Sequence, residues 1–113
     1  MNKLYIIRGD STTIETTFTN DDGSVIDLTG ATVYFTVKKK QGDVDDDALI
    51  KKDVTTHVDA ANGVTAIELT ASDTDIEVGE HVWDLQIKYV NGNVQSTSAG
   101  IVEVSQDITQ RTT

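Results

Sequence analysis

Two histidines, His57 and His81, are the side chains best suited to acid–base chemistry or metal binding. Either role requires a second oriented group beside the imidazole, and no partner motif stands near either residue. His81 alternates in phase with Trp83 and Leu85, so we expect it at the edge of the core with its ring hydrogen-bonded. His57 stands in a predicted strand, and we expect it on the surface. Neither histidine is predicted to be catalytic or to ligate a metal.

A run of carboxylates could attract calcium, and it consists of Asp43, Asp45, Asp46 and Asp47. Its spacing lacks the glycine and the distal glutamate of an EF-hand loop, and a hard cation needs about seven convergent oxygens. We interpret the run as a solvated loop that its own repulsion extends, with calcium binding as the alternative.

Nucleophilic catalysis is equally unsupported. Cysteine is absent, which excludes a thiolate nucleophile, a disulfide and a Cys-ligated zinc. No other nucleophile and base can be paired from the residues available. We therefore predict no catalytic residue, no cofactor and no metal site, and an enzyme is the least favoured class.

The tripeptide Arg8-Gly9-Asp10 is the one that integrins recognise. Three residues carry little information, and a Gly-Asp pair between two strands forms an ordinary turn. We predict a turn here, with adhesion as the alternative.

Sugar binding is a further alternative, because four threonines are expected on outer sheet faces: Thr13, Thr17, Thr32 and Thr36. Carbohydrate platforms usually present coplanar aromatic rings. Only Tyr34 and Tyr89 are expected to point outward, so we interpret the threonines as groups that solvate the sheets.

The charge balance restricts the partners. Nine basic residues face nineteen acidic ones, a formal net charge of −10, and the only basic run is Lys38-Lys39-Lys40. Such a chain repels phosphate backbones and anionic membranes, so neither nucleic acid nor membrane is expected as a partner. No targeting segment or membrane span is visible. The length fits one domain, residues 1–113, with a polar tail at 105–113.

The elements that position these residues are predicted to be strands. Thr, Val and Ile total 40 residues and proline is absent, a composition that favours pleated sheets. Alternation of period two predicts strands at residues 3–8, 12–19, 31–39, 48–52, 54–58, 64–70, 81–89 and 94–104, with a brief strand or bend at 25–28. Turns are expected at Asn20–Gly23, Asn62-Gly63 and Asn91-Gly92, and a turn or one 3₁₀ turn at 71–79.

Seven to nine short strands about ten residues apart predict an all-β, two-sheet antiparallel sandwich. Helical crossovers are missing, so a parallel sheet is excluded. The natural core anchor is Trp83, packed with Phe18, Phe35 and Leu85.

The order of short motifs resembles that of a known family. The motifs are Ile7-Arg8-Gly9-Asp10-Ser11 with Ile14 and Phe18, Asp22-Gly23, Ile26-Asp27-Leu28-Thr29-Gly30-Ala31-Thr32-Val33, Phe35-Thr36-Val37, Asn62-Gly63, Leu69-Thr70, Asp73-Thr74, Gly79, Trp83-Asp84-Leu85-Gln86, Gly100 and Asp107-Ile108-Thr109. They are similar to the immunoglobulin-like N-terminal domain of bacteriophage baseplate upper proteins, over almost the whole chain. The family usually has a tyrosine two residues after the position of Gly79, where this chain has His81, whose imidazole could donate a similar hydrogen bond.

The resemblance implies an immunoglobulin-like sandwich that serves as a virion component of a phage or prophage infecting Gram-positive bacteria. Its role would be non-catalytic assembly by contact with other tail or baseplate subunits, in virions assembled in the host cytoplasm. A homo-oligomer is left open, and no contact residue is predicted. The alternative is a cell-surface or glycan-binding adhesion module.

Overall fold

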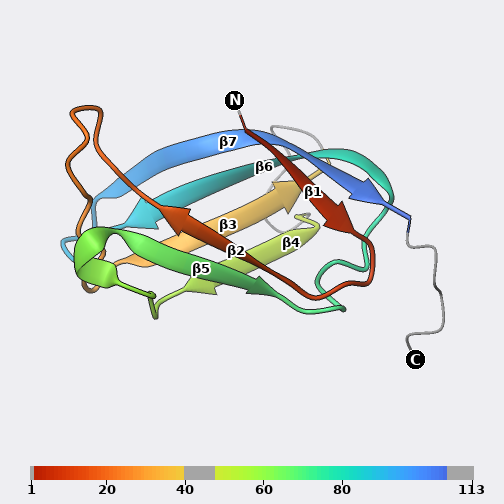
Figure 1. Cartoon of the computed structure of the whole chain (residues 1–113), viewed down its shortest axis with the longest axis horizontal. Helices are drawn as coiled ribbons and strands as arrows, with labels where there is room; N and C mark the ends of the chain where they lie inside the picture. Colours follow the sequence, from red (N-terminus) through yellow and green to blue (C-terminus); the bar gives the residue numbers. More distant parts are fainter. Residues whose placement is uncertain (1, 40–47, 107–113) are drawn as a thin grey trace.

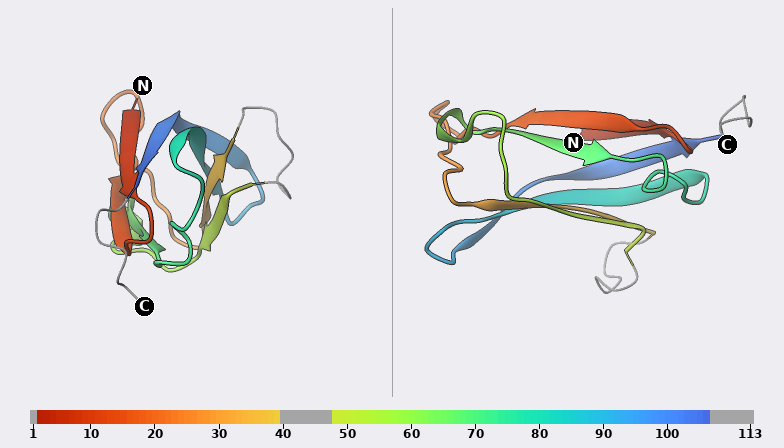
Figure 2. Two further views of the ribbon diagram at one scale, coloured as in Figure 1. Left: turned by 90° about the vertical axis from the view of Figure 1, so that its right-hand side faces the viewer. Right: turned by 90° about the horizontal axis from the view of Figure 1, so that it is seen from below.

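The computed structural model describes residues 2–39 and 48–106, and the regular secondary structure in this part of the chain is almost entirely strand (Figure 1). The strands are β1 (Asn2–Ile7), β2 (Thr12–Thr17), β3 (Thr32–Lys38), β4 (Ile50–Val54), β5 (Val64–Leu69), β6 (Gly79–Lys88) and β7 (Val94–Ser105), with one 3₁₀ turn, η2 (Ala60–Asn62). Figure 2 shows that they form two layers. The predicted all-β sandwich is confirmed.

The larger layer is a five-stranded sheet in the order β1-β7-β6-β3-β4, and the smaller layer pairs β2 with β5. All pairings are antiparallel except β1 with β7, which run parallel from the Asn2–Gly100 pair to the Ile7–Ser105 pair. The exclusion of parallel pairing is therefore wrong for this pair. A parallel neighbour needs a long connection but not a helix, and the intervening strands of the sandwich supply that connection.

Alternation places the core as predicted. Side chains of β3 point inward at Val33, Phe35 and Val37, and those of β6 at every odd position from His81 to Ile87. The rings of Trp83 and Phe35 lie 6.3 Å apart, centroid to centroid. Trp83 Nε1 donates a hydrogen bond to the carbonyl oxygen of Ile101 at 3.2 Å, so its one polar group is satisfied inside the core.

The structure differs from the prediction at residues 48–58, where two strands are expected, and specifies residues 25–28, where a brief strand or bend is expected. Residues 48–52 and 54–58 give a single strand, β4, because the chain leaves the larger sheet after Val54 and crosses to the smaller one. Residues 25–28 make only an isolated bridge between Thr19 and Val25. The side chains of Ile26 and Leu28 are nevertheless buried, so this segment closes one end of the core without joining a sheet.

The two Asn-Gly pairs have different roles. Asn91-Gly92 forms the predicted β6–β7 hairpin, closed by a hydrogen bond from Tyr89 N to Asn93 O. Asn62-Gly63 does not join two paired strands, because β4 and β5 belong to different sheets. Instead Gly63 ends η2 with a left-handed φ of 77°, a conformation that costs glycine little.

Candidate interaction surfaces

His81 lies at the core edge, as predicted. Its side chain is buried, and its Nε2 donates a hydrogen bond to the carbonyl oxygen of Glu77 at 2.7 Å. This bond runs from a strand back to the backbone four residues earlier, as a tyrosine corner does. The imidazole therefore fixes the loop before β6.

His57 is half-buried and both of its ring nitrogens are hydrogen-bonded, so the predicted position on the surface is wrong. Its Nε2 lies 2.8 Å from the carbonyl oxygen of Ala31, and its Nδ1 lies 2.9 Å from the Thr65 hydroxyl oxygen. A carbonyl only accepts, so Nε2 carries a proton, and in the neutral ring Nδ1 accepts from the hydroxyl. Because Ala31 precedes β3 and Thr65 belongs to β5, His57 links the two sheets. An isolated histidine in a strand-like segment gave no signal of this role.

The Arg8-Gly9-Asp10 triplet forms the predicted turn between β1 and β2, closed by a hydrogen bond from Asp10 N to Ile7 O. The Asp10 carbonyl oxygen accepts from the hydroxyl of buried Thr74 at 2.8 Å. Arg8 Nε donates to a carboxylate oxygen of Asp75 at 3.0 Å. The triplet thus fastens the β1–β2 turn to the loop at residues 70–78.

That loop covers all of the turn predicted at 71–79 except Gly79, which begins β6. Three ion pairs hold it to other segments of the chain. The pairs are Arg8–Asp75, Lys39–Glu77 at 2.9 Å and Lys52–Asp73 at 2.7 Å. The hydrogen bond from the Lys52 ammonium keeps the pKa of the Asp73 carboxyl below its usual value, and Lys39 lowers the pKa of Glu77 in the same way. Acidic residues at every second position of this turn were the only sequence signal for these ion pairs. Their basic partners are distant in the sequence, so the pairs themselves could not be predicted.

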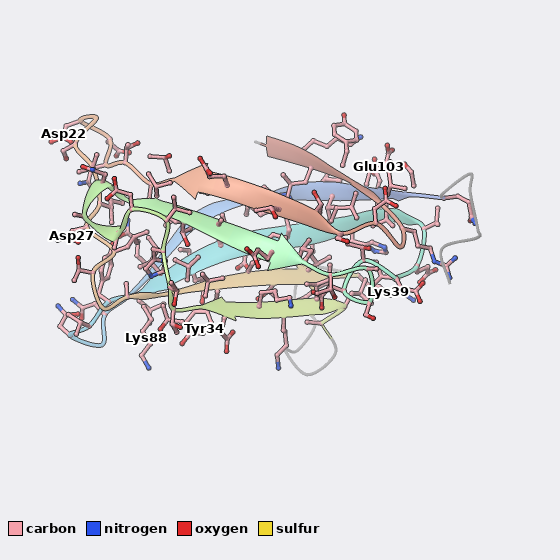
Figure 3. The ribbon with its side chains drawn as sticks, turned by 60° about the horizontal axis from the view of Figure 1, so that its bottom comes forward. Asp22, Asp27, Tyr34, Lys39, Lys88 and Glu103 are labelled. Atoms are coloured by element: carbon pink, nitrogen blue, oxygen red, sulfur yellow. The ribbon has the colours of Figure 1, made fainter. Side chains whose placement is uncertain are left out.

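An apolar patch lies on the outer face of the larger sheet, over β1 and β7. It consists of Tyr5 (70% exposed), Ile7 (50%) and Ile101 (37%), and we call it the β1–β7 patch. Lys3 lies within the patch, because it stands beside Ile101 in the register and its Nζ is 5.4 Å from the centroid of the Tyr5 ring. It also pairs with Glu80 at 3.4 Å and with Glu103 at 3.8 Å. Figure 3 shows Glu103 on this side of the molecule. Exposed aromatic and aliphatic side chains with charged groups among them are typical of a protein contact.

A shallow hollow of about 340 Å³ lies on the outer face of β3, β4 and β6. Its lining includes Tyr34, Thr36, Lys51, Asp53 and Gln86. Tyr34 points away from the core, as predicted, at the position labelled in Figure 3.

The expectation for Tyr89 is wrong, because its ring packs partly buried against the core and its hydroxyl donates to Gln95 Oε1 at 2.8 Å. The four threonines do lie on outer faces, Thr13 and Thr17 exposed and Thr32 and Thr36 half-buried.

The acidic run Asp43–Asp47 lies outside the described residues, as do Lys40 and all of the polar tail beyond Gln106. Within residues 2–39 and 48–106, no group of three or more His, Asp or Glu side chains is arranged to hold a metal ion. No helix in the same part of the chain is long and apolar enough to cross a membrane.

Comparison with known proteins identifies the family to which the chain belongs. Curated proteins give no match to the chain. The family model of the BppU N-terminal domain, a domain of a phage baseplate upper protein, matches residues 2–111, which is essentially the whole chain. The β-sandwich, the alternating burial of side chains along its strands and the hydrogen bond from buried His81 to Glu77 are therefore features of a member of a phage baseplate family. The chain belongs to the BppU N-terminal domain family.

Proposed function

We propose that residues 1–113 act as one domain, a non-catalytic structural component of a phage tail or baseplate that joins virion subunits through protein–protein contacts. The observation that carries the proposal is the family match over residues 2–111. A preformed sandwich suits this role, because docking of a rigid surface loses little conformational entropy.

The β1–β7 patch is the surface we assign to such a contact. Tyr5 and Ile101 come from neighbouring strands, since Tyr5 pairs with Glu103 and Lys3 with Ile101. Their side chains are held on a sheet, so burying them in an interface removes apolar area from water without ordering a loop. Lys3, Glu80 and Glu103 form a charged network beside these side chains that orients a partner.

The protein composition of purified phage particles tests this proposed function. Phage purified on a density gradient should contain the protein at a fixed ratio to the other tail subunits, detected by antibody and by mass spectrometry. Its absence from purified particles would refute the proposal.

A matched pair of variants then tests the patch. Ile101→Lys should lower incorporation into particles by about tenfold, while Val58→Lys should leave it unchanged, because Val58 is 61% exposed and lies in the loop after β4. Equal incorporation of the two variants would show that the β1–β7 patch is not the contact surface. Both variants should retain the wild-type melting temperature, since neither side chain lies in the core.

A glycan-binding adhesion module is the second candidate, and the hollow beside Tyr34 is the observation that favours it. One aromatic ring with hydroxyl, amide and charged groups around it can stack on and hydrogen-bond to a sugar. Binding of the purified protein to isolated cell walls, abolished by Tyr34→Ala, supports this candidate. Retention on tail proteins, with none on cell walls, supports assembly instead.

A further inference from the structure

The edge of β7 that faces away from β6 is only half covered. β6 pairs with β7 from Val94 to Val104, whereas β1 pairs only with residues from Gly100 to Ser105. In the part of the chain that the structure describes, residues 94–99 thus have no strand on their outer side. Figure 1 shows β1 running beside the C-terminal half of β7 alone. An exposed strand edge with unpaired N–H and C=O groups is a template for another strand.

A groove adjoins this open edge. It has a volume of about 400 Å³, and Gln95, Ser96 and Thr97 of β7 line one side of it. The other side is formed by the end of β2 and the loop that follows, from Thr17 to Asp21, together with Ile26. We call it the β2–β7 groove.

Hydrogen-bonding groups dominate the lining of the groove. Its two large apolar side chains, Phe18 and Ile26, are buried. Among the described residues, no side-chain hydrogen bond or ion pair is found for Thr17, Thr19 or Asp21. Such groups remain available to the main chain and polar side chains of an incoming segment.

Both walls come from stretches of the chain that contain no basic residue. No Lys or Arg occurs between Arg8 and Lys38, or between Lys88 and Arg111. The first stretch carries five acidic residues, Asp10, Glu15, Asp21, Asp22 and Asp27. Asp22 and Asp27, labelled in Figure 3, lie at the same end of the molecule as the loop that forms the groove. Asp21 is the one charged side chain among the described residues that line the groove, and Lys88, labelled at the same end in Figure 3, is not part of the lining. The lining therefore favours a cationic occupant.

We propose that the β2–β7 groove binds an extended, Lys- or Arg-bearing segment of another virion subunit, which adds as a strand to the free edge of β7 at residues 94–99. The segment continues the line of β1 along β7, its main chain pairs with β7, and its basic side chains meet Asp21 and its neighbours. This inference rests on the proposed function and names the chemistry of the partner. A second copy of the chain is the alternative occupant, because β2 and β5 carry acidic outward side chains (Glu15 and Glu68) but the edge strand β4 carries Lys51 and Lys52, and the exchange experiment below distinguishes the two.

Hydrogen exchange of the free protein and of the protein in purified particles tests strand addition. Backbone amides of residues 94–99 should exchange at least about tenfold more slowly in the particle, while those of residues 55–58, outside the sheets, should not change. Unchanged exchange at residues 94–99 in particles that contain the protein refutes strand addition at the β2–β7 groove. The proposed function as a virion component would still stand. Concentration-dependent protection of the same amides in the isolated protein would identify a second copy as the occupant and also overturn it.

Charge reversal tests the chemistry of the occupant. Asp21→Lys should lower incorporation into particles by about tenfold. Glu68→Lys is the matched control, since it changes the net charge equally on an exposed position of β5 outside the groove, and should cost less than about twofold. Equal losses for both variants, or no loss for either, contradict the proposal. Absence of the wild-type protein from particles is the separate result that refutes the function itself.

Discussion

Replacing Gly63 by alanine tests how the two layers of the sandwich are closed at the η2 end. An added Cβ would lie 2.7 Å from the carbonyl oxygens of both Phe18 and Ile26, which are backbone atoms that cannot turn aside. The Gly63 carbonyl also accepts a hydrogen bond from Phe18 N at 2.9 Å, and the Phe18 carbonyl accepts from Ile26 N at 3.2 Å. Any shift that relieves the clash weakens these bonds.

The magnitude follows from two contributions. A left-handed φ costs a residue with a Cβ about 1 kcal/mol, and displacing two backbone hydrogen bonds adds about 2 kcal/mol. The Gly63→Ala variant should therefore lose about 3 kcal/mol, or about 12 °C in melting temperature for a chain of this size. Gly92→Ala isolates the first contribution, because Gly92 also has a positive φ, 92°, but a Cβ there has nothing within 4 Å.

Thermal and urea unfolding, followed by circular dichroism, measure both variants. We expect a loss of about 1 kcal/mol for Gly92→Ala, so the difference between the two is about 2 kcal/mol. Equal losses would show that the close approach to Phe18 and Ile26 does not hold in solution, and the reasoning would be refuted.

Three further results are expected. His57→Ala leaves the buried Thr65 hydroxyl without its partner and should cost about 2–3 kcal/mol in urea unfolding; a loss below about 0.5 kcal/mol would contradict the inter-sheet link. Because Lys52 lowers the folded-state pKa of Asp73, the stabilisation is present above the ordinary carboxyl pKa of about 4 and is lost as pH falls through the lower folded value. Melting temperatures measured down an acid series should therefore fall more steeply for the wild type than for Asp73→Asn. Native Trp83 should emit at shorter wavelength than in urea, and an unchanged emission would place it in water.

Most of the sandwich could be predicted from the sequence, because burial of one sheet face imposes a period of two. The clearest case is Val33, Phe35 and Val37, which alternate over a whole strand and are all buried. What periodicity cannot give is which strand lies beside which. The parallel β1–β7 pair joins residues about one hundred positions apart, and nothing in either strand marks the other as its neighbour.

The interaction surfaces are harder to predict from the sequence than the strands, because they also depend on which strands are neighbours. Tyr5 and Ile101 become one patch only after β1 is placed beside β7, so neither residue carries the signal alone. His57 was misplaced because its two partners, Ala31 and Thr65, come from different segments. Prediction succeeded where the interacting residues are close in the sequence. Examples are the Arg8-Gly9-Asp10 turn and His81, which is hydrogen-bonded to Glu77 four residues earlier.

We propose that this domain is part of the tail or baseplate of a phage. Immunogold electron microscopy of purified phage particles tests it most directly. We expect label at the distal end of the tail, at the baseplate, on most particles. Label confined to host cell walls, or particles without label, would contradict it.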